Sequence, residues 1–379
     1  MRTFWAASRR GWRPWVAEPG CESAPAGEPA SEATEACSSD TVGQGWSAPE
    51  FLASVIISTY NRRDALVETL RALGKQTVPA VSYEIVVVDD GSTDRTEEAV
   101  TDLGLPCTVR SFRHPVNQGV SAGRNLAIRN ASGRYLILLS DDVIVPDDFI
   151  ALHVETLKRF PGFWVVGGFR QLPSLRETPF GRYLDDLEGR FTEARKLALI
   201  DRNIWELNWP TARNLSLPLE DLAATGLFDE RFRVTCEDQD LAQRARQVGI
   251  RFLYNDDIAC LHNDQAGDLA RYCRFQRRGA IDTVRLCAKY PEVHGGSPLI
   301  TVNGYVTIRD GLVLAAKKVV KRLLSAEPIM AGLMRWVRLL ERSHLPETAL
   351  RRLYCVLIGL SIFRGWREGL RGLERERVD

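Results

Sequence analysis

The sequence predicts an α/β fold with a mostly parallel, doubly wound sheet, followed by a helical C-terminal region. Short uninterrupted apolar runs, such as residues 54–58, are typical of strands that are buried on both faces. Amphipathic segments separate these runs, and in residues 63–75 the side chains of Leu66, Leu70 and Leu73 fall on one helical face. Strands that alternate with helices of about 10–15 residues indicate βαβ units and therefore parallel pairing.

The alternation continues through the first half of the chain. Further strands are predicted over residues 84–89, 107–112, 135–139 and 163–169. The intervening helices are predicted over residues 93–102, 118–130 and 147–160. Residues 181–209 show no assignable pattern, after which we expect strands over 211–217 and 250–254 and a helix over 236–248. Ligands bind beyond the carboxyl ends of the strands in such sheets, so chemistry is expected in the residues that follow them.

Composition divides the chain into three regions. Residues 1–50 are rich in Ala, Glu, Ser, Gly and Pro and predict a disordered leader. Residues 51–303 carry the alternating pattern and form the predicted catalytic domain. Residues 304–379 predict a basic, amphipathic helical region, because residues 305–379 hold 15 Lys and Arg against 8 Asp and Glu.

Charge, cysteines and hydropathy exclude several classes of protein. The formal net charge of +1 gives no global field that would mark a nucleic-acid binder. The eight cysteines form no C-x-x-C pair, which fits a reducing cytoplasm rather than a disulfide framework. The N-terminus lacks a secretory signal, and no run of 18 uncharged apolar residues predicts a membrane span. We therefore expect a cytoplasmic protein.

Polar residues follow three of the predicted strands. Tyr60 follows the first strand, Asp90 ends the second, and Asp141 and Asp142 follow the strand over residues 135–139. Tyr60 has the ring to stack on a nucleobase. Adjacent carboxylates after a buried strand are costly unless a cation neutralises them, and Mg²⁺ suits one or two carboxylates with phosphate oxygens. A turn with a helix cap explains either acidic motif alone.

Three further segments carry candidate groups. Glu237 and Asp238 begin a predicted helix, and one of them could be a general base. The helix macrodipole also stabilises acidic residues in the first turn, so a purely structural role is the alternative. His262 follows an apolar run and becomes a candidate ligand if the fold brings it to Asp142. Arg124 lies in a glycine-containing helix start that could approach phosphate or simply pack closely.

These segments, in this order, resemble the family 2 glycosyltransferases of GT-A fold. The resemblance rests on residues 55–61, 84–92, 117–125, 140–142 and 237–241, and it covers residues 51–293. It implies an enzyme with a nucleotide-diphosphate-sugar donor, a Mg²⁺ or Mn²⁺ cofactor and inversion at the anomeric carbon. The metal motif of the family commonly begins with Asp. Ser140 stands at that position here, and Asp142 keeps the last acid.

The resemblance also implies roles for individual residues. The implied donor nucleotide-binding residues are Ser58, Tyr60, Asn61, Asp90, Arg124 and Asp141. The implied metal ligands are Asp142 and His262. Asp238 would be the catalytic base, with Glu237 as the other candidate, and Asn214 and Ser216 match a segment near the transferred sugar and the acceptor.

The function predicted from these residues is metal-assisted single displacement onto an acceptor hydroxyl, in glycan, polysaccharide or glycolipid synthesis. The acceptor would be a glycan or a lipid-linked molecule. A metal-dependent nucleotidyl- or phosphotransferase would use the same crevice, although no P-loop motif is present in the sequence. A non-catalytic nucleotide- or glycan-binding module would not need a base such as Asp238.

The C-terminal region supports two interpretations. Lys317, Lys318, Lys321 and Arg322 alternate with apolar residues, and the apolar run 353–363 has basic flanks. Such helices suit an anionic membrane surface, with the protein peripheral on the inner face of the cell membrane. They equally suit a helical layer that packs on the catalytic domain or on a second subunit.

Overall fold

The structure is a computed structural model, which describes residues 49–263, 268–295, 297–308, 310–343 and 345–376. Nearly all of the predicted leader, residues 1–50, lies outside this part of the chain. The first strand begins at Phe51, where the apolar pattern of the sequence begins.

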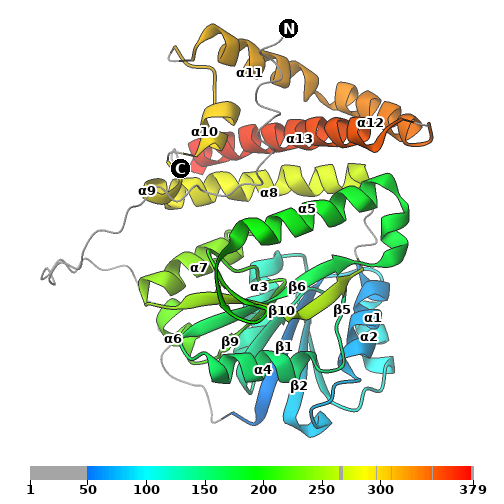
Figure 1. Ribbon diagram of the computed structural model, residues 1–379, viewed down its shortest axis with the longest axis vertical. Coiled ribbons are helices and arrows are strands. Elements are labelled where there is room, and N and C mark those ends of the chain that lie inside the picture. Colours follow the sequence, from blue (N-terminus) through cyan, green and yellow to red (C-terminus); the bar gives the residue numbers. More distant parts are fainter. Residues whose placement is uncertain (1–48, 264–267, 296, 309, 344, 377–379) are drawn as a thin grey trace, which may run out of the picture.

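A ten-stranded mixed sheet forms the centre of the molecule (Figure 1). Its strands are β1 (Phe51–Thr59), β2 (Tyr83–Asp89), β3 (Thr108–Arg113), β4 (Gly133–Leu139), β5 (Val143–Ile144), β6 (Phe163–Gln171), β7 (Lys196–Asp201), β8 (Ile204–Leu207), β9 (Asn214–Pro218) and β10 (Arg251–His262). They lie in the order β3-β2-β1-β4-β9-β6-β10-β8-β7, and β5 pairs with β10 beside this path.

The parallel part of the sheet is the part that the sequence predicts best. β1 lies between β2 and β4, and Val55 is in register with Ile85 on one side and Ile137 on the other. β9 runs antiparallel to both β4 and β6. The predicted α/β fold with a mostly parallel doubly wound sheet is therefore confirmed, and β9 reverses the strand direction between β4 and β6, as β5 and β8 do beside β10.

Helices cover both faces of the sheet. They are α1 (Arg63–Leu73), α2 (Thr96–Asp102), α3 (Val120–Arg129), α4 (Phe149–Arg159), α6 (Asp221–Thr225) and α7 (Glu237–Gln247), with short 3₁₀ turns η2 (Ala80–Ser82) and η3 (Pro173–Glu177). Leu66 of α1 and Phe149 of α4 are buried against Val55 and its neighbours on one face. Ala127 of α3 and Leu241 of α7 are buried on the other. The two cores explain why the strands are apolar on both sides.

The stretch 181–209, which has no clear pattern in the sequence, contains three elements. α5 (Pro179–Arg195) begins with a hydrogen bond from the Gly181 amide to the Thr178 hydroxyl, and β7 and β8 follow as an edge hairpin. Leu197 and Leu199 of β7 are exposed, so the strand has no buried apolar run for a sequence pattern to reveal. Phe180 and Tyr183 of α5 pack on the C-terminal helices.

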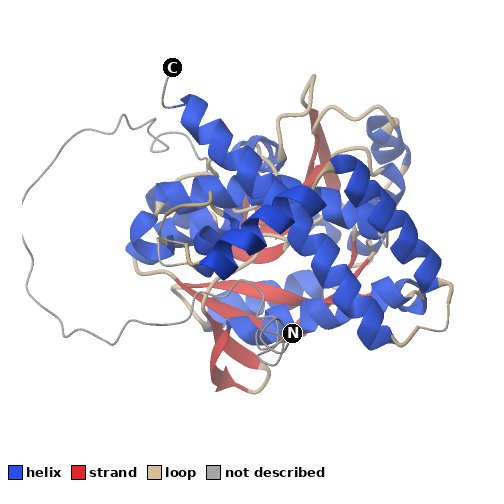
Figure 2. Cartoon of the chain, turned by 90° about the horizontal axis from the view of Figure 1, so that it is seen from above, coloured by secondary structure: helices blue, strands red, loops and turns tan. Residues whose placement is uncertain are grey.

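The C-terminal helices form a separate layer beyond α5 (Figure 1), and the view from above shows this layer in front of the sheet (Figure 2). They are α8 (Leu269–Lys289), α9 (Pro291–His294), α10 (Pro298–Asn303), α11 (Leu312–Leu324), α12 (Glu327–Glu341) and α13 (Glu347–Glu376). Tyr354 and Leu357 of α13 are buried with Phe180 of α5. The apolar run 353–363 is therefore largely packed within the layer, and none of the described helices is long and apolar enough to cross a bilayer.

A buried polar cluster joins α4 to β9. His153 is fully buried, and its ring nitrogens lie 2.8 Å from the Ser216 hydroxyl and 2.8 Å from the Asn214 amide oxygen. The same Asn214 amide donates to the Ile258 carbonyl at 3.3 Å. Burial lowers the pKa of His153 from 6.5 to about 4, although its hydrogen bond with Asn214 opposes this shift. His153 is accordingly neutral in the folded protein at physiological pH.

Because His153 is buried as a neutral ring, we expect the folded protein to lose stability in acid. A folded-state pKa below the unfolded value means that protonation favours the unfolded chain, so the stabilisation present above pH 6.5 is lost as the pH falls toward 4. The difference corresponds to about 3 kcal/mol of unfolding free energy. Urea unfolding of wild type and His153→Gln over this pH range tests the effect. The variant should be less stable at neutral pH but less acid-sensitive, and equal acid sensitivity would contradict the assignment.

Candidate active site

Three neighbouring strands end at one edge of the sheet, and each is followed by polar residues. Tyr60 and Asn61 follow β1, Asp89 and Asp90 lie at the end of β2, and Asp141 follows β4 by two residues. Because β1 pairs with both β2 and β4 in parallel register, these residues share a crevice. Their grouping is that predicted from the carboxyl-end rule.

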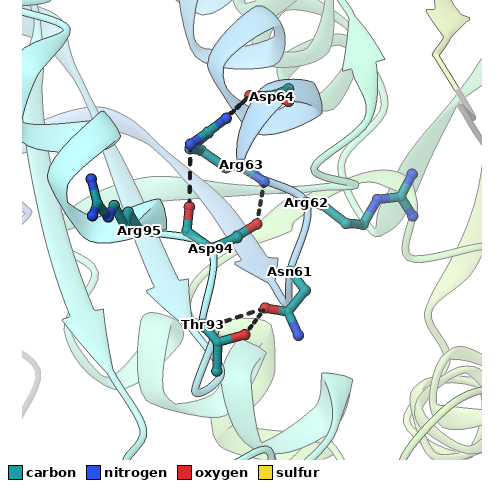
Figure 3. A pocket seen from close by; sticks show the side chains of 7 residues that line it. All are labelled: Asn61, Arg62, Arg63, Asp64, Thr93, Asp94 and Arg95. Carbon is teal, nitrogen blue, oxygen red and sulfur yellow. Dashed lines mark hydrogen bonds and ion pairs between the residues drawn. The ribbon is translucent and has the colours of Figure 1, made fainter.

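The side of the crevice formed by β1 and β2 has an open pocket of about 410 Å³ (Figure 3). The Asn61 side-chain oxygen accepts hydrogen bonds from the Thr93 backbone amide at 2.8 Å and from its hydroxyl at 3.2 Å. Asn61 has a φ of 52°, a left-handed conformation that Asn tolerates well. Tyr60 is 45% exposed and available for stacking. Asn61 therefore fixes the loop beside which the Tyr60 ring is presented.

Asp90 and Ser58 lie deeper in the crevice. The buried Asp90 carboxylate accepts hydrogen bonds from the backbone amides of Gln118 and Gly119 at 2.9 and 2.8 Å, and it lies 2.7 Å from His114 Nδ1. These contacts fix the loop before α3. Ser58 is partly buried against Gly123 of α3, where a Cβ atom would come within 2.1 Å of the Ser58 hydroxyl oxygen. Gly123 thus permits α3 to approach the end of β1.

Asp141 and Asp142 form a buried acidic pair after β4. The Thr59 hydroxyl donates to Asp141 at 2.7 Å, and the Arg62 Nε atom lies 3.5 Å from the Asp141 carboxylate. Arg62 also forms an ion pair with Asp142. In Figure 3 the Arg62 side chain points away from Arg63, Asp94 and Thr93, toward the other side of its loop. One guanidinium therefore contacts both carboxylates.

His262 reaches Asp142 because the end of β10 is tied to the segment after β4. His262 is in antiparallel register with Val143, and the Asn263 amide donates to the Asp142 carbonyl at 2.7 Å. His262 Nε2 lies 3.1 Å from the Asp142 carboxylate, and the Gln171 amide nitrogen lies 3.2 Å from Nδ1. The structure thus brings together the two residues that the resemblance implies as metal ligands.

The pKa values of the two neighbouring aspartates are shifted in opposite directions. Burial raises the pKa of Asp141 to about 6, against the effect of the Arg62 charge. Burial acts in the same direction on Asp142, but His262 and Arg62 outweigh it and hold the pKa of Asp142 well below its usual range. Among the described residues, no group of three or more His, Cys, Asp or Glu side chains is arranged to hold a metal alone.

Glu237 and Asp238 begin α7 but face different surroundings. Glu237 is buried and accepts a hydrogen bond from Arg124 Nη1 at 2.6 Å. Burial and the neighbouring Asp238 charge raise the pKa of Glu237 to about 7, against the effect of Arg124. Asp238 is only partly buried, and one of its oxygens is 3.4 Å from the Ala212 amide. Asp238 is therefore the more accessible of the two candidate bases.

Arg124 is a buried residue of α3. Its guanidinium is 5% exposed, binds Glu237, and donates to the Ala212 carbonyl at 3.1 Å. The Arg124 guanidinium also lies 5.5 Å from the centre of the Phe228 ring. The Arg124 guanidinium thus links α3 to α7, and its role near the donor stays a prediction.

Asn214 and Ser216, which match a segment near the transferred sugar and the acceptor, are fully buried within β9 and bonded to His153, as described above. The placement of this segment near the sugar stays a prediction. The residue beside them, Arg213, does reach the crevice. Its guanidinium donates to Glu188 of α5 at 2.7 Å and lies 4.5 Å from the centre of the Phe169 ring.

Two site residues were missed by the sequence analysis. Arg62 directly follows Tyr60 and Asn61 at the end of β1, so its position in the sequence is a signal that could have identified it. The sequence gives no such signal for Arg213, because its position depends on β9 inserting antiparallel between β4 and β6. Burial acts to lower the pKa of Arg213, but Glu188 outweighs it, and Asp142 and Asp238 add to the upward shift. The Arg213 carbonyl also accepts a hydrogen bond from the Ser140 amide at 2.9 Å, directly before the acidic pair.

Residues 54–202 match a family model described as Glycosyl transferase family 2. The chain is a glycosyltransferase, and this part of it is similar to family 2. The enzyme is 27% identical over 299 residues to the uncharacterized glycosyltransferase YfnE of Bacillus subtilis, covering 66% of this chain and 74% of that protein. It is 30% identical over 131 residues to the dolichol-phosphate mannosyltransferase of Pyrococcus furiosus, covering 35% of this chain and 37% of that protein.

A solved structure shows the same fold. It is the mannosyltransferase PcManGT from Pyrobaculum calidifontis in complex with GDP-Man and Mn²⁺, with a TM-score of 0.53 and 19% sequence identity. The match covers 86% of this glycosyltransferase and 92% of that chain. The curated relatives other than YfnE are matched over less of their length. For example, the match to an uncharacterized glycosyltransferase of Rickettsia felis covers 28% of this chain and 17% of that protein.

The placement of Arg124 gives a direct prediction. Arg124→Ala leaves the Glu237 carboxylate buried without its partner, and breaking a buried ion pair typically costs about 3–5 kcal/mol of unfolding free energy. Arg129→Ala on the same helix is the matched control, because Arg129 is exposed and its change should cost less than about 0.5 kcal/mol. Urea unfolding measures both. Wild-type stability in Arg124→Ala, combined with weaker donor binding, would support the donor-contact role.

Proposed function

We propose that the enzyme transfers a sugar from a nucleotide-diphosphate-sugar donor to an acceptor hydroxyl with inversion, by metal-assisted single displacement. The observation that carries this proposal is that residues 212–213 adjoin both acidic segments: the Arg213 carbonyl accepts from the Ser140 amide at 2.9 Å, and the Ala212 amide lies 3.4 Å from the Asp238 carboxylate. The segments that carry the candidate metal ligand and the candidate base therefore meet at one short stretch of backbone. A displacement reaction needs this arrangement, because leaving group and attacking hydroxyl must lie on opposite sides of one anomeric carbon.

The residues at the Asp142 end fit a divalent metal that is shared with the donor. Asp142 and His262 offer one carboxylate and one imidazole, a combination that suits Mn²⁺ or Mg²⁺ when phosphate oxygens and water complete the shell. Rotation of the Gln171 amide would place its oxygen against Nδ1–H of His262 and free Nε2 as a ligand. When bound, the metal would stabilise the negative charge that grows on the diphosphate leaving group.

The nucleoside would occupy the side of the crevice formed by β1 and β2. Tyr60 supplies the exposed ring, and Asn61 holds the adjoining loop. Asp141 lies next to the metal end and would accept from the ribose, with Thr59 holding its carboxylate. Asp90 and Ser58 would shape the floor of this side, because Asp90 already binds the two backbone amides before α3.

Asp238 would act on the acceptor. As the acceptor oxygen bonds to the anomeric carbon, the bond from that carbon to the diphosphate breaks and the hydroxyl proton passes to the Asp238 carboxylate. The Glu237 carboxylate is less suitable, because Arg124 holds it inside the protein. Inversion follows from a single displacement, and the anomeric configuration of the product by NMR distinguishes it from retention.

The acceptor would lie against Asp238, which is only partly buried at the start of α7. It would be a glycan or a lipid-linked molecule.

The choice of base is tested by two single substitutions. Asp238→Asn should lower kcat by at least about 100-fold while donor affinity stays near wild type, because the base acts only when the acceptor attacks. Turnover is measured by nucleotide diphosphate release with acceptor present, and donor binding by calorimetry.

Glu237→Gln is the control for this test. Because Glu237 is paired with Arg124 in the interior, its substitution should lower the melting temperature more than it lowers kcat. A severe kcat defect in Glu237→Gln with a mild one in Asp238→Asn would assign the base to Glu237. If neither variant loses activity, the single-displacement mechanism with a base at the start of α7 is wrong.

A further inference from the structure

α11 is oriented with its charged side inward and its apolar side outward. Lys318 is buried, and its ammonium group donates to Asp310 at 2.8 Å and to the Tyr305 carbonyl at 2.9 Å. Lys321 donates to Asn303 at 3.2 Å and lies 5.6 Å from the centre of the Phe363 ring of α13. Two lysines that the sequence offers as surface charges thus attach α11 to the helical layer.

The opposite side of α11 is an exposed apolar stripe. It comprises Leu312, Ala316, Val319 and Leu323, spaced at four, three and four residues, with Val313, Val320 and Leu324 beside them. Leu312 is 91% exposed and Leu323 is 62% exposed. An amphipathic helix of a soluble domain normally buries this face, so its exposure indicates a surface that contacts something else.

α12 continues the exposed apolar surface. Met330 and Val337 face α13 and are buried, whereas Ile329, Trp336 and Leu339 are exposed. Trp336 is 50% exposed, and Leu339 is 65% exposed. In Figure 1, α11 and α12 lie in the outer part of the helical layer, away from the sheet. We call these exposed residues of α11 and α12 the outer apolar face.

The charges around this face are positive. Lys317, Arg322, Arg335 and Arg342 are exposed on or just after the two helices, and α11 contains no acidic residue. The two acids of α12 are already engaged. Glu327 forms an ion pair with Arg364 at 3.0 Å, and Glu341 accepts from the Tyr354 hydroxyl at 2.7 Å. The outer apolar face therefore has a basic border without free exposed acids on these helices.

We propose that the outer apolar face docks on an anionic lipid bilayer, with α11 and α12 lying in the plane of the interface. Exposed apolar side chains with Lys and Arg at the border match an interface of acyl chains and anionic headgroups. A second copy of the chain fits less well, because two-fold pairing of this face would bring like charges together. Neither helix needs to cross the bilayer.

The position of this face has a consequence for the reaction. The helical layer lies beyond the edge of the sheet to which the parallel strands point, so a bound bilayer would be on the same side of the catalytic domain as the crevice (Figure 1). Lipid attachment of the acceptor would then bring it to the enzyme within the membrane surface. The docking itself does not depend on the proposed reaction, because it uses residues outside the crevice.

Co-sedimentation of the full chain with vesicles tests the proposal without donor or acceptor. Wild type should bind phosphatidylcholine vesicles that contain phosphatidylglycerol, bind pure phosphatidylcholine much more weakly, and lose affinity as salt is raised. Val319→Gln/Leu323→Gln should abolish binding with an unchanged melting temperature, because both side chains are exposed. Val81→Gln is the matched control, since Val81 is 83% exposed in η2, far from the face.

The basic border is tested separately. Lys317→Gln/Arg322→Gln/Arg335→Gln should weaken binding to anionic vesicles roughly 100-fold, at about fivefold for each charge. Equal binding by wild type and Val319→Gln/Leu323→Gln, or no binding by wild type, overturns the proposal. So does light scattering that shows a wild-type dimer and a Val319→Gln/Leu323→Gln monomer, which would make the face an interface between copies.

Discussion

The burial of Asp141 and Asp142 at the end of β4 is the constraint on which the site depends. Two adjacent carboxylates cannot both be ionised in a buried position without nearby positive charge. Arg62, which follows β1, supplies positive charge to both carboxylates, and His262 at the end of β10 lies 3.1 Å from Asp142. The antiparallel pairing of β10 with β5 keeps His262 in place, and the parallel pairing of β1 with β4 does the same for Arg62.

The two acids at the start of α7 differ in accessibility for a similar reason, because only one of them is paired with a buried arginine. Arg124 is committed to Glu237 inside the protein, which leaves Asp238 as the accessible carboxylate. Arg213, which directly precedes β9, is held by Glu188 of α5. The charged groups around the crevice are therefore positioned by several different elements of the fold.

Sequence reasoning succeeded where local pattern and position carry the information. The parallel strands could be predicted from uninterrupted apolar runs, and Tyr60, Asp90 and Asp142 from their place after those strands. It could not reveal side-chain orientations that a tertiary contact decides. Asn214 and Ser216 lie on β9, whose antiparallel entry turns them into the core toward His153. The inward turn of Lys318 depends on Asp310 and a carbonyl group, so a helical pattern alone could not reveal it.

The central claim is that Asp142 holds a divalent metal together with a nucleotide-diphosphate sugar. Thermal unfolding with a panel of GDP- and UDP-sugars, with and without Mn²⁺, measures this directly, because a ligand at 100 times its Kd adds about 2.7 kcal/mol of stability. We expect at least one nucleotide sugar to stabilise wild type and Asp148→Asn when Mn²⁺ is present, and we expect Asp142→Asn to lose this stabilisation. Asp148 is exposed and serves as the acidic control. Stabilisation that is independent of Mn²⁺, or that persists in Asp142→Asn, would contradict the account.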